Sequence, residues 1–242
     1  MAFAAAIAVA GVRVARAADP SALWHIVHNE CVPRAEQGAA PAPCAVLDRA
    51  AGYAILKDLV GATQFLLIPT ARVSGIEDPA ILAPGTPNYW QQAWHARDLV
   101  EQNIGHPMPR DTMSLAINSA YGRTQDQLHI HIDCIRPDVR DTLAAYHAAI
   151  GPHWAAFPVP LAGEHYRAMR LDQGGLGSVN PFRLLARDVP QKDMGQHTLV
   201  LVGAEFSGIG PGFILLDDRV NLASGDQASG ESLQDHDCAV AR

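Results

Sequence analysis

The chain has few basic residues for its length and no stretch in which they gather. Across 242 residues, 18 Lys and Arg face 25 Asp and Glu, so the formal net charge is -7 and the pI is about 5.8. Proteins that bind nucleic acid usually carry a basic patch, so this balance argues against nucleic acid as the main partner. Any anion must be held by a local site rather than by the overall field.

The sequence has no Cys-x-x-Cys spacing, the commonest signal for a structural zinc or a redox dithiol. Its four cysteines allow three disulfide pairings. We predict Cys31–Cys44, around a loop rich in Pro, Ala and Gly, and Cys134–Cys238, which would tie the C-terminal region to a histidine-bearing strand. Four buried, reduced thiols are the alternative.

A long apolar run is also missing, because the stretch from Phe3 to Val12 is shorter than the roughly 20 residues that cross a bilayer. Ala15-Arg16-Ala17 fits the small-x-small rule for signal cleavage, although no Lys or Arg precedes the run. We interpret residues 1–18 as a signal peptide or a truncated membrane anchor. The protein is then exported, either periplasmic or on the periplasmic side of the inner membrane.

The remaining composition, 48% hydrophobic and 18% charged, is that of a globular protein with a sizeable core. Apolar patterning and turn residues predict short strands and helices in both halves of the chain. The predicted strands are 52–56, 64–69, 113–118, 127–134, 198–202 and 212–216, and the predicted helices are 20–31, 88–105, 137–150 and 227–238. The half 151–242 weakly echoes the half 20–150. It is interpreted as a degenerate repeat completing one domain, with chance similarity of two hairpins as the alternative.

One strand carries the chemistry. From Gln127 the chain alternates polar and apolar residues, so Gln127, His129, His131 and Asp133 share one face, which the alternation predicts to be open. The preceding turn is rich in hydrogen-bond donors: Asn118, Ser119, Gly122, Thr124 and Gln125. Two imidazoles beside such a turn indicate a phosphate site with a nucleophile in it. A pair of ordinary half-exposed strand histidines is the alternative.

These segments resemble the histidine-triad (HIT-like) nucleotide hydrolases and transferases, and more closely the CDP-diacylglycerol pyrophosphatase branch. The resemblance covers nearly the whole chain after residue 20. It rests on the strand order of the first half and on the segments 31–53, 65–70, 114–119, 122–125, 129–132, 134–140 and Cys238. It implies an α+β fold with an antiparallel, half-barrel sheet and hydrolysis of CDP-diacylglycerol to phosphatidate and CMP at a membrane surface.

The resemblance also implies residue roles. His129 stands where the family has its nucleophile, so it would attack the cytidylyl phosphorus and form a CMP–histidine intermediate, while His131 holds the phosphoryl oxygens. The other nucleotide-binding positions implied are Asn118, Gly122, Arg123, Thr124, Gln125 and Gln127. The family chemistry uses no metal and no other cofactor, and no carboxylate cage suited to magnesium is visible.

The sequence departs from the family pattern at Gln127, where the full triad has its first histidine. An amide donates and accepts hydrogen bonds but does not titrate. One alternative function is therefore a lapsed HIT-like protein that binds nucleotides or nucleotide sugars without hydrolysing them. Another is a metal enzyme with His129, His131 and Asp133 as ligands, a set with poor tetrahedral geometry. The oligomeric state is left open.

Overall fold

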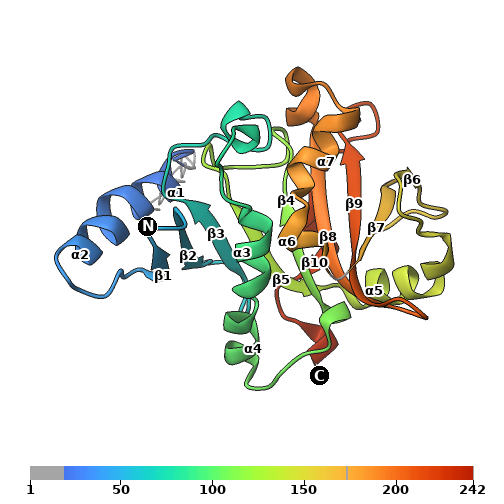
Figure 1. Ribbon diagram of the computed structural model, residues 1–242, viewed down its shortest axis with the longest axis horizontal. Helices are drawn as coiled ribbons and strands as arrows, with labels where there is room; N and C mark the ends of the chain where they lie inside the picture. The colour runs from blue at the N-terminus through green and yellow to red at the C-terminus, as the bar shows by residue number, and fades with distance from the viewer. Residues whose placement is uncertain (1–18, 173, 242) are drawn as a thin grey trace, which may run out of the picture.

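The computed structural model describes residues 19–172 and 174–241 (Figure 1). The leader predicted over residues 1–18 lies outside this part. Among the described residues, none of the helices combines the length and apolar character needed to span a bilayer.

The fold is α+β, as expected, with one ten-stranded antiparallel sheet. The strand order is β1-β2-β3-β5-β4-β8-β9-β7-β6, and β10 pairs with one end of β5. The bounds are β1 Cys44–Asp48, β2 Tyr53–Lys57, β3 Phe65–Pro69, β4 Met113–Ile117, β5 Ile130–Ile135, β6 Ala155–Ala156, β7 Arg167–Asp172, β8 His197–Phe206, β9 Gly210–Arg219 and β10 Gln234–Asp235.

The two halves of the chain share this sheet because β4 pairs with β8, with Ser114 opposite Val202 and Ile117 opposite Leu199. The early strands match the prediction. The two strands of the β8–β9 hairpin are each ten residues long, whereas the predicted strands 198–202 and 212–216 cover only part of them. The strands β1, β6 and β7 were not predicted. The interpretation of the second half as a repeat stays a prediction.

The helices lie on both faces of the sheet. Their bounds are α1 Ala22–His25, a π-helical turn Ile26–Cys31, α2 Val32–Glu36, α3 Tyr89–His95, α4 Asp98–Ile104, α5 Pro137–Ala145, α6 Gly175–Ser178 and α7 Pro181–Asp188. Short 3-10 turns cover Pro79–Leu82, Arg110–Thr112, His147–Ala149, Gln191–Gln196, Gly230–Leu233 and Ala239–Ala241. The N-terminal helical run thus continues past its predicted end at Cys31. The run predicted over 88–105 divides into α3 and α4, and it ends at Gly105 with φ 93°, as expected.

The terminal helix predicted over 227–238 is wrong. This segment forms a 3-10 turn, Gly230–Leu233, and then β10, which pairs with β5 through Gln234–Ile135 and Asp235–Cys134. Gly230 packs so closely against Thr198 and Val200 that a Cβ there would clash. The β10 part of this segment therefore forms its backbone hydrogen bonds with the sheet and not within a helix.

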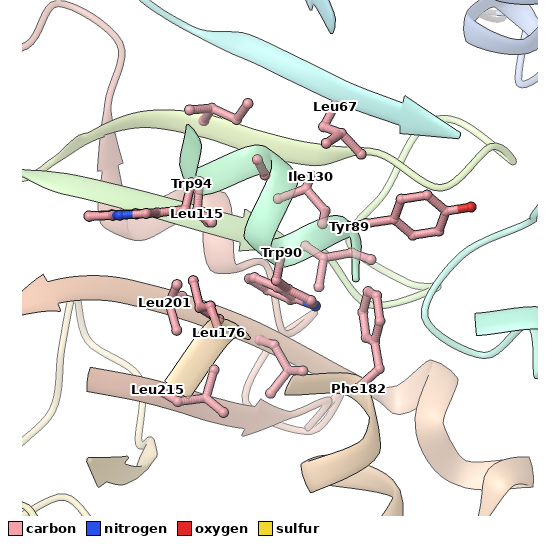
Figure 2. Packing of buried hydrophobic residues seen from close by; sticks show 14 of the residues in the cluster. Leu67, Tyr89, Trp90, Trp94, Leu115, Ile130, Leu176, Phe182, Leu201 and Leu215 are labelled. Atoms are coloured by element: carbon pink, nitrogen blue, oxygen red, sulfur yellow. The ribbon is translucent and has the colours of Figure 1, made fainter. Parts of the chain in front are cut away.

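The main core lies on one face of the sheet, under α3 (Figure 2). Trp90 meets the edge of Phe182 with ring centroids 5.4 Å apart, and Trp94 meets Phe213 at 4.9 Å. Ile130 of β5 belongs to this cluster, as does Ile132. Because side chains alternate along an extended chain, His131 of β5 and His129, which immediately precedes β5, face the other side of the sheet.

Both predicted disulfides are confirmed. Cys31–Cys44 spans α2 and the loop that follows it, with a Cα separation of 5.8 Å, and Cys134–Cys238 joins β5 to the C-terminal segment with a Cα separation of 5.2 Å. Two disulfides and no free cysteine among the described residues fit an oxidising compartment outside the cytosol.

Candidate active site

His129 and His131 lie next to each other at the start of β5, with ring centroids 4.8 Å apart. The prediction that their face is open is wrong, because Gln127, His129, His131 and Asp133 are all less than 10% exposed. On one side, Leu66 stands opposite His131 in the sheet and packs with residues of the N-terminal helical run. On the other, the segment leading into β10 covers the strand. Alternation alone does not show these covering segments.

The tautomer of His129 follows from one short hydrogen bond. Its Nδ1 lies 2.7 Å from the backbone carbonyl oxygen of Gln127, which can only accept, so Nδ1 carries the proton and donates. The lone pair is then on Nε2. Burial lowers the pKa of His129 further than the Gln127 contact raises it. At neutral pH the side chain is an uncharged imidazole with a free lone pair, the form that a nucleophile needs.

His131 contacts two residues that the sequence analysis missed. Its Nδ1 lies 2.6 Å from Nε2 of Gln64 and 3.4 Å from Oε1 of Glu231. Burial, followed by the neighbouring His129, lowers the pKa of His131 to about 3, so this ring is also neutral.

Glu231 is the centre of a hydrogen-bond network on this face. It accepts from Nε2 of Gln64 at 3.0 Å and from Nδ2 of Asn118 at 3.1 Å, and its Oε1 lies 3.5 Å from Nε2 of His236. Burial alone would raise the pKa of Glu231. The hydrogen bonds from His236 and from the two amides, Gln64 and Asn118, outweigh it and hold the pKa of Glu231 well below its usual range.

His236 links Glu231 to the far end of β5. Its Nδ1 lies 2.8 Å from Oδ2 of Asp133, whose Oδ1 accepts from the Thr63 hydroxyl at 2.6 Å and from the Cys134 amide at 2.9 Å. Hydrogen bonds to Asp133 and Glu231 raise the pKa of His236 to about 10. An imidazolium held between two carboxylates therefore lies behind the two neutral histidines.

The predicted phosphate-binding residues divide into two groups. Asn118 is buried in the network, where its Oδ1 also accepts from the Glu231 amide at 3.1 Å. Around the turn, the Gly122 amide donates to the Ser119 hydroxyl and the Arg123 amide donates to the Ser119 carbonyl. The Thr124 side chain is exposed. The turn is thus held together by Ser119, with Thr124 at its surface.

The two glutamines of this region are occupied by backbone groups. Gln127 donates to the carbonyls of Pro69 and Ala71, at 3.1 and 2.9 Å, and so fixes the chain that leaves β3. Gln125 accepts from the Leu23 amide at 3.1 Å and donates to the Asp19 carbonyl at 2.9 Å, which anchors the N-terminal helical run. In this structure both amides position segments around the histidines.

Among residues 19–172 and 174–241, no three His, Cys, Asp or Glu side chains are placed to hold a metal ion. Asp133, the third ligand of the metal-enzyme alternative, has its oxygens directed to Thr63, Cys134 and His236. The observed cluster is instead two neutral imidazoles with a polar network behind them, an arrangement suited to nucleophilic attack on phosphorus.

A comparison with known families gives a match over nearly the whole chain. The profile of the CDP-diacylglycerol pyrophosphatase family matches residues 18–242. The chain belongs to the CDP-diacylglycerol pyrophosphatase family. It is a phosphoanhydride hydrolase, and CDP-diacylglycerol is the substrate on which this family acts.

The sequence analysis did not predict three residues of this site: Gln64, Glu231 and His236. Gln64 stands at the edge of a predicted strand, and nothing in the local pattern marks it. For His236 a signal was present, because it lies two residues before Cys238, a cysteine predicted to be tied to β5. Taking that disulfide as a distance constraint would have placed residues 231–236 beside the histidines.

A substitution at Arg123 tests whether its side chain stabilises the fold or contacts the substrate. Its guanidinium is 10% exposed and pairs with Glu77 through two contacts of 2.6 and 2.7 Å. Arg123→Gln is expected to lower the free energy of unfolding by roughly 1–3 kcal/mol, because it leaves the partly buried Glu77 carboxylate without its charged partner. Urea unfolding measures this, and Glu77→Gln, removing the other partner, should act less than additively with it. A fall in kcat/KM without loss of stability would instead indicate that the guanidinium contacts substrate.

Proposed function

We propose that hydrolysis runs through a nucleotidyl-histidine at His129. The lone pair on Nε2 forms a bond to the cytidylyl phosphorus, and the bond from that phosphorus to the phosphatidate oxygen breaks. Water then attacks the same phosphorus, the bond from that phosphorus to Nε2 breaks and its electron pair returns to the His129 ring, and CMP is released while one proton of the water passes to the solvent. The hydrogen bond from Nδ1 of His129 to the Gln127 carbonyl is the observation that carries this proposal, because it directs the lone pair of a neutral ring to Nε2.

In this proposal the other residues act around the phosphorus. His131 donates a hydrogen bond from its ring to a phosphoryl oxygen. Thr124, which is exposed on the turn, donates a hydrogen bond to the substrate. Asn118 holds Glu231, while Gly122, Arg123, Gln125 and Gln127 hold the turn and the adjoining segments. Phosphatidate is a good leaving group because a phosphate monoester has a second pKa of about 6. With a pKa of about 6, phosphatidate can leave without receiving a proton, so the mechanism needs no titrating side chain at position 127, which is Gln127.

The lipid part of the substrate supports a further proposal about place. Diacylglycerol chains stay in a bilayer, so the protein would meet CDP-diacylglycerol at a membrane surface. The two disulfides fit export, and a periplasmic location agrees with both features.

Hydrolysis in ¹⁸O-labelled water tests the proposal. Purified protein is given CDP-diacylglycerol and excess EDTA, and both products are analysed by mass spectrometry. We expect CMP and phosphatidate in equal amounts, with the label in CMP alone, because water attacks the cytidylyl phosphorus. Label in phosphatidate would place the attack on the other phosphorus and overturn the histidine assignment. Tight substrate binding with no products would support the lapsed nucleotide-binding protein.

A further inference from the structure

We propose that Gln64 is a positioning residue that fixes the tautomer of His131, so that His131 presents its Nε2–H to a phosphoryl oxygen, with Glu231 holding Gln64 in place. The chemical use of that proton rests on the proposed function, whereas the tautomer itself does not.

The first step is the orientation of the Gln64 amide. Gln64 immediately precedes β3 and is fully buried. One end of its amide lies 3.0 Å from Oε1 of Glu231. An ionised carboxylate only accepts hydrogen bonds, so the end facing it is the NH₂ group and not the amide oxygen.

The second step assigns the proton of His131. The same Gln64 nitrogen lies 2.6 Å from Nδ1 of His131. Its two hydrogens are then directed to Glu231 and to His131, so Nδ1 of His131 accepts and must carry the lone pair. In a neutral imidazole the single proton is consequently on Nε2.

The third step concerns the direction of that proton. Nε2 of His131 is buried and has no hydrogen-bond partner among the described residues. Leaving such a group unpaired costs about 1–3 kcal/mol. The His131 ring lies next to that of His129, with centroids 4.8 Å apart, so a phosphoryl group attacked by His129 would lie close to the His131 ring. The Nε2–H of His131 would then be a neutral, preorganised donor for the negative charge that develops on the phosphoryl oxygen in the transition state.

Glu231 favours the alternative tautomer of His131. Its Oε1 lies 3.4 Å from Nδ1 of His131, so without Gln64 the carboxylate would attract the ring proton to Nδ1. The other groups facing Glu231 are Asn118, which donates a hydrogen bond to the same carboxylate, and the His236 imidazolium, which lies 3.5 Å from it. Gln64 is thus the residue that separates the carboxylate from the ring proton.

The test combines NMR of the ring nitrogens with kinetics. In the unmodified protein at neutral pH, ¹⁵N–¹H correlation spectra should show His131 protonated at Nε2. Gln64→Met should move the proton to Nδ1 and lower kcat by roughly 10²–10³-fold with a smaller effect on KM, the loss typical of one transition-state donor. Adding Glu231→Gln to Gln64→Met removes the attraction and should restore part of the lost activity.

Gln234→Met is the matched control. Gln234 is also a buried glutamine on this face. Its amide donates to the carbonyl and hydroxyl of Ser114 and lies 3.5 Å from the backbone carbonyl of His131, but it contacts no ring nitrogen. It should lower the melting temperature about as much as Gln64→Met and leave the His131 tautomer unchanged.

The outcomes separate the inference from the proposed function. A proton on Nδ1 in the unmodified protein overturns the tautomer assignment, even if Gln64→Met fails to fold and whatever the labelled-water experiment gives. A tautomer change with unaltered kcat overturns the use of the proton in catalysis, while attack by His129 stands.

Discussion

His129→Ala is expected to abolish release of CMP from CDP-diacylglycerol, lowering kcat by at least about 10³-fold. The substitution removes the proposed nucleophile itself. The hydrogen-bond donors that remain would still bind the substrate but would have no atom with which to form the covalent intermediate.

Rapid-quench trapping distinguishes this chemical loss from a structural one. With ³²P on the cytidylyl phosphorus, the unmodified protein should carry an acid-labile label that forms and decays within the turnover time. His129→Ala should carry none and keep its affinity for substrate. His95→Ala, which changes an exposed histidine on α3, is the control and should be trapped normally. Label on the His129→Ala protein, or a rate within tenfold of normal, would contradict the mechanism.

The second large effect is expected from removing the disulfide that holds the C-terminal segment. Cys134 and Cys238 are 104 positions apart, so replacing both by alanine should lower the free energy of unfolding by about 4.7 kcal/mol, from loop closure. Activity should fall as well, because His236 lies between this disulfide and Glu231 along the chain. Urea unfolding and steady-state kinetics measure the two effects.

The other disulfide provides the comparison. Cys31 and Cys44 are 13 positions apart and lie at the edge of the sheet, so replacing both should lower stability by about 3 kcal/mol. Under conditions where the protein stays folded, kcat should remain close to normal. Equal losses of kcat in the two variants would indicate that neither disulfide acts on the site specifically.

The sequence was most informative where the signal was local. Alternation and turn residues located β2, β3, β4 and the histidine strand, and Gly105 marked the end of α4. Prediction failed over residues 227–238, whose composition suits a helix, because pairing with β5 and the close contact of Gly230 override that preference. Propensity is a weak guide where tertiary contacts decide the conformation.

The two histidines and Asn118 that the sequence analysis predicted for the site lie in one buried cluster in the structure, whereas their surroundings were not predicted. The open face predicted for β5 is covered by segments that are distant in sequence. Gln125 and Gln127 are polar side chains that bond to backbone carbonyls and amides. Residue type alone does not distinguish a donor that holds a loop from one that holds a phosphate, since both require the same chemistry.

The C-terminal segment also sets the order in which the enzyme becomes competent. His129 and His131 leave the ribosome, or any export channel, roughly a hundred residues before Glu231 and His236. Until β10 adds to β5, the histidines lack the carboxylate and the imidazolium behind them. An incompletely synthesised or incompletely exported chain therefore carries the proposed nucleophile without its supporting network. Catalytic competence is acquired in the last step of assembly and only after long-range closure, which is a slow class of folding event.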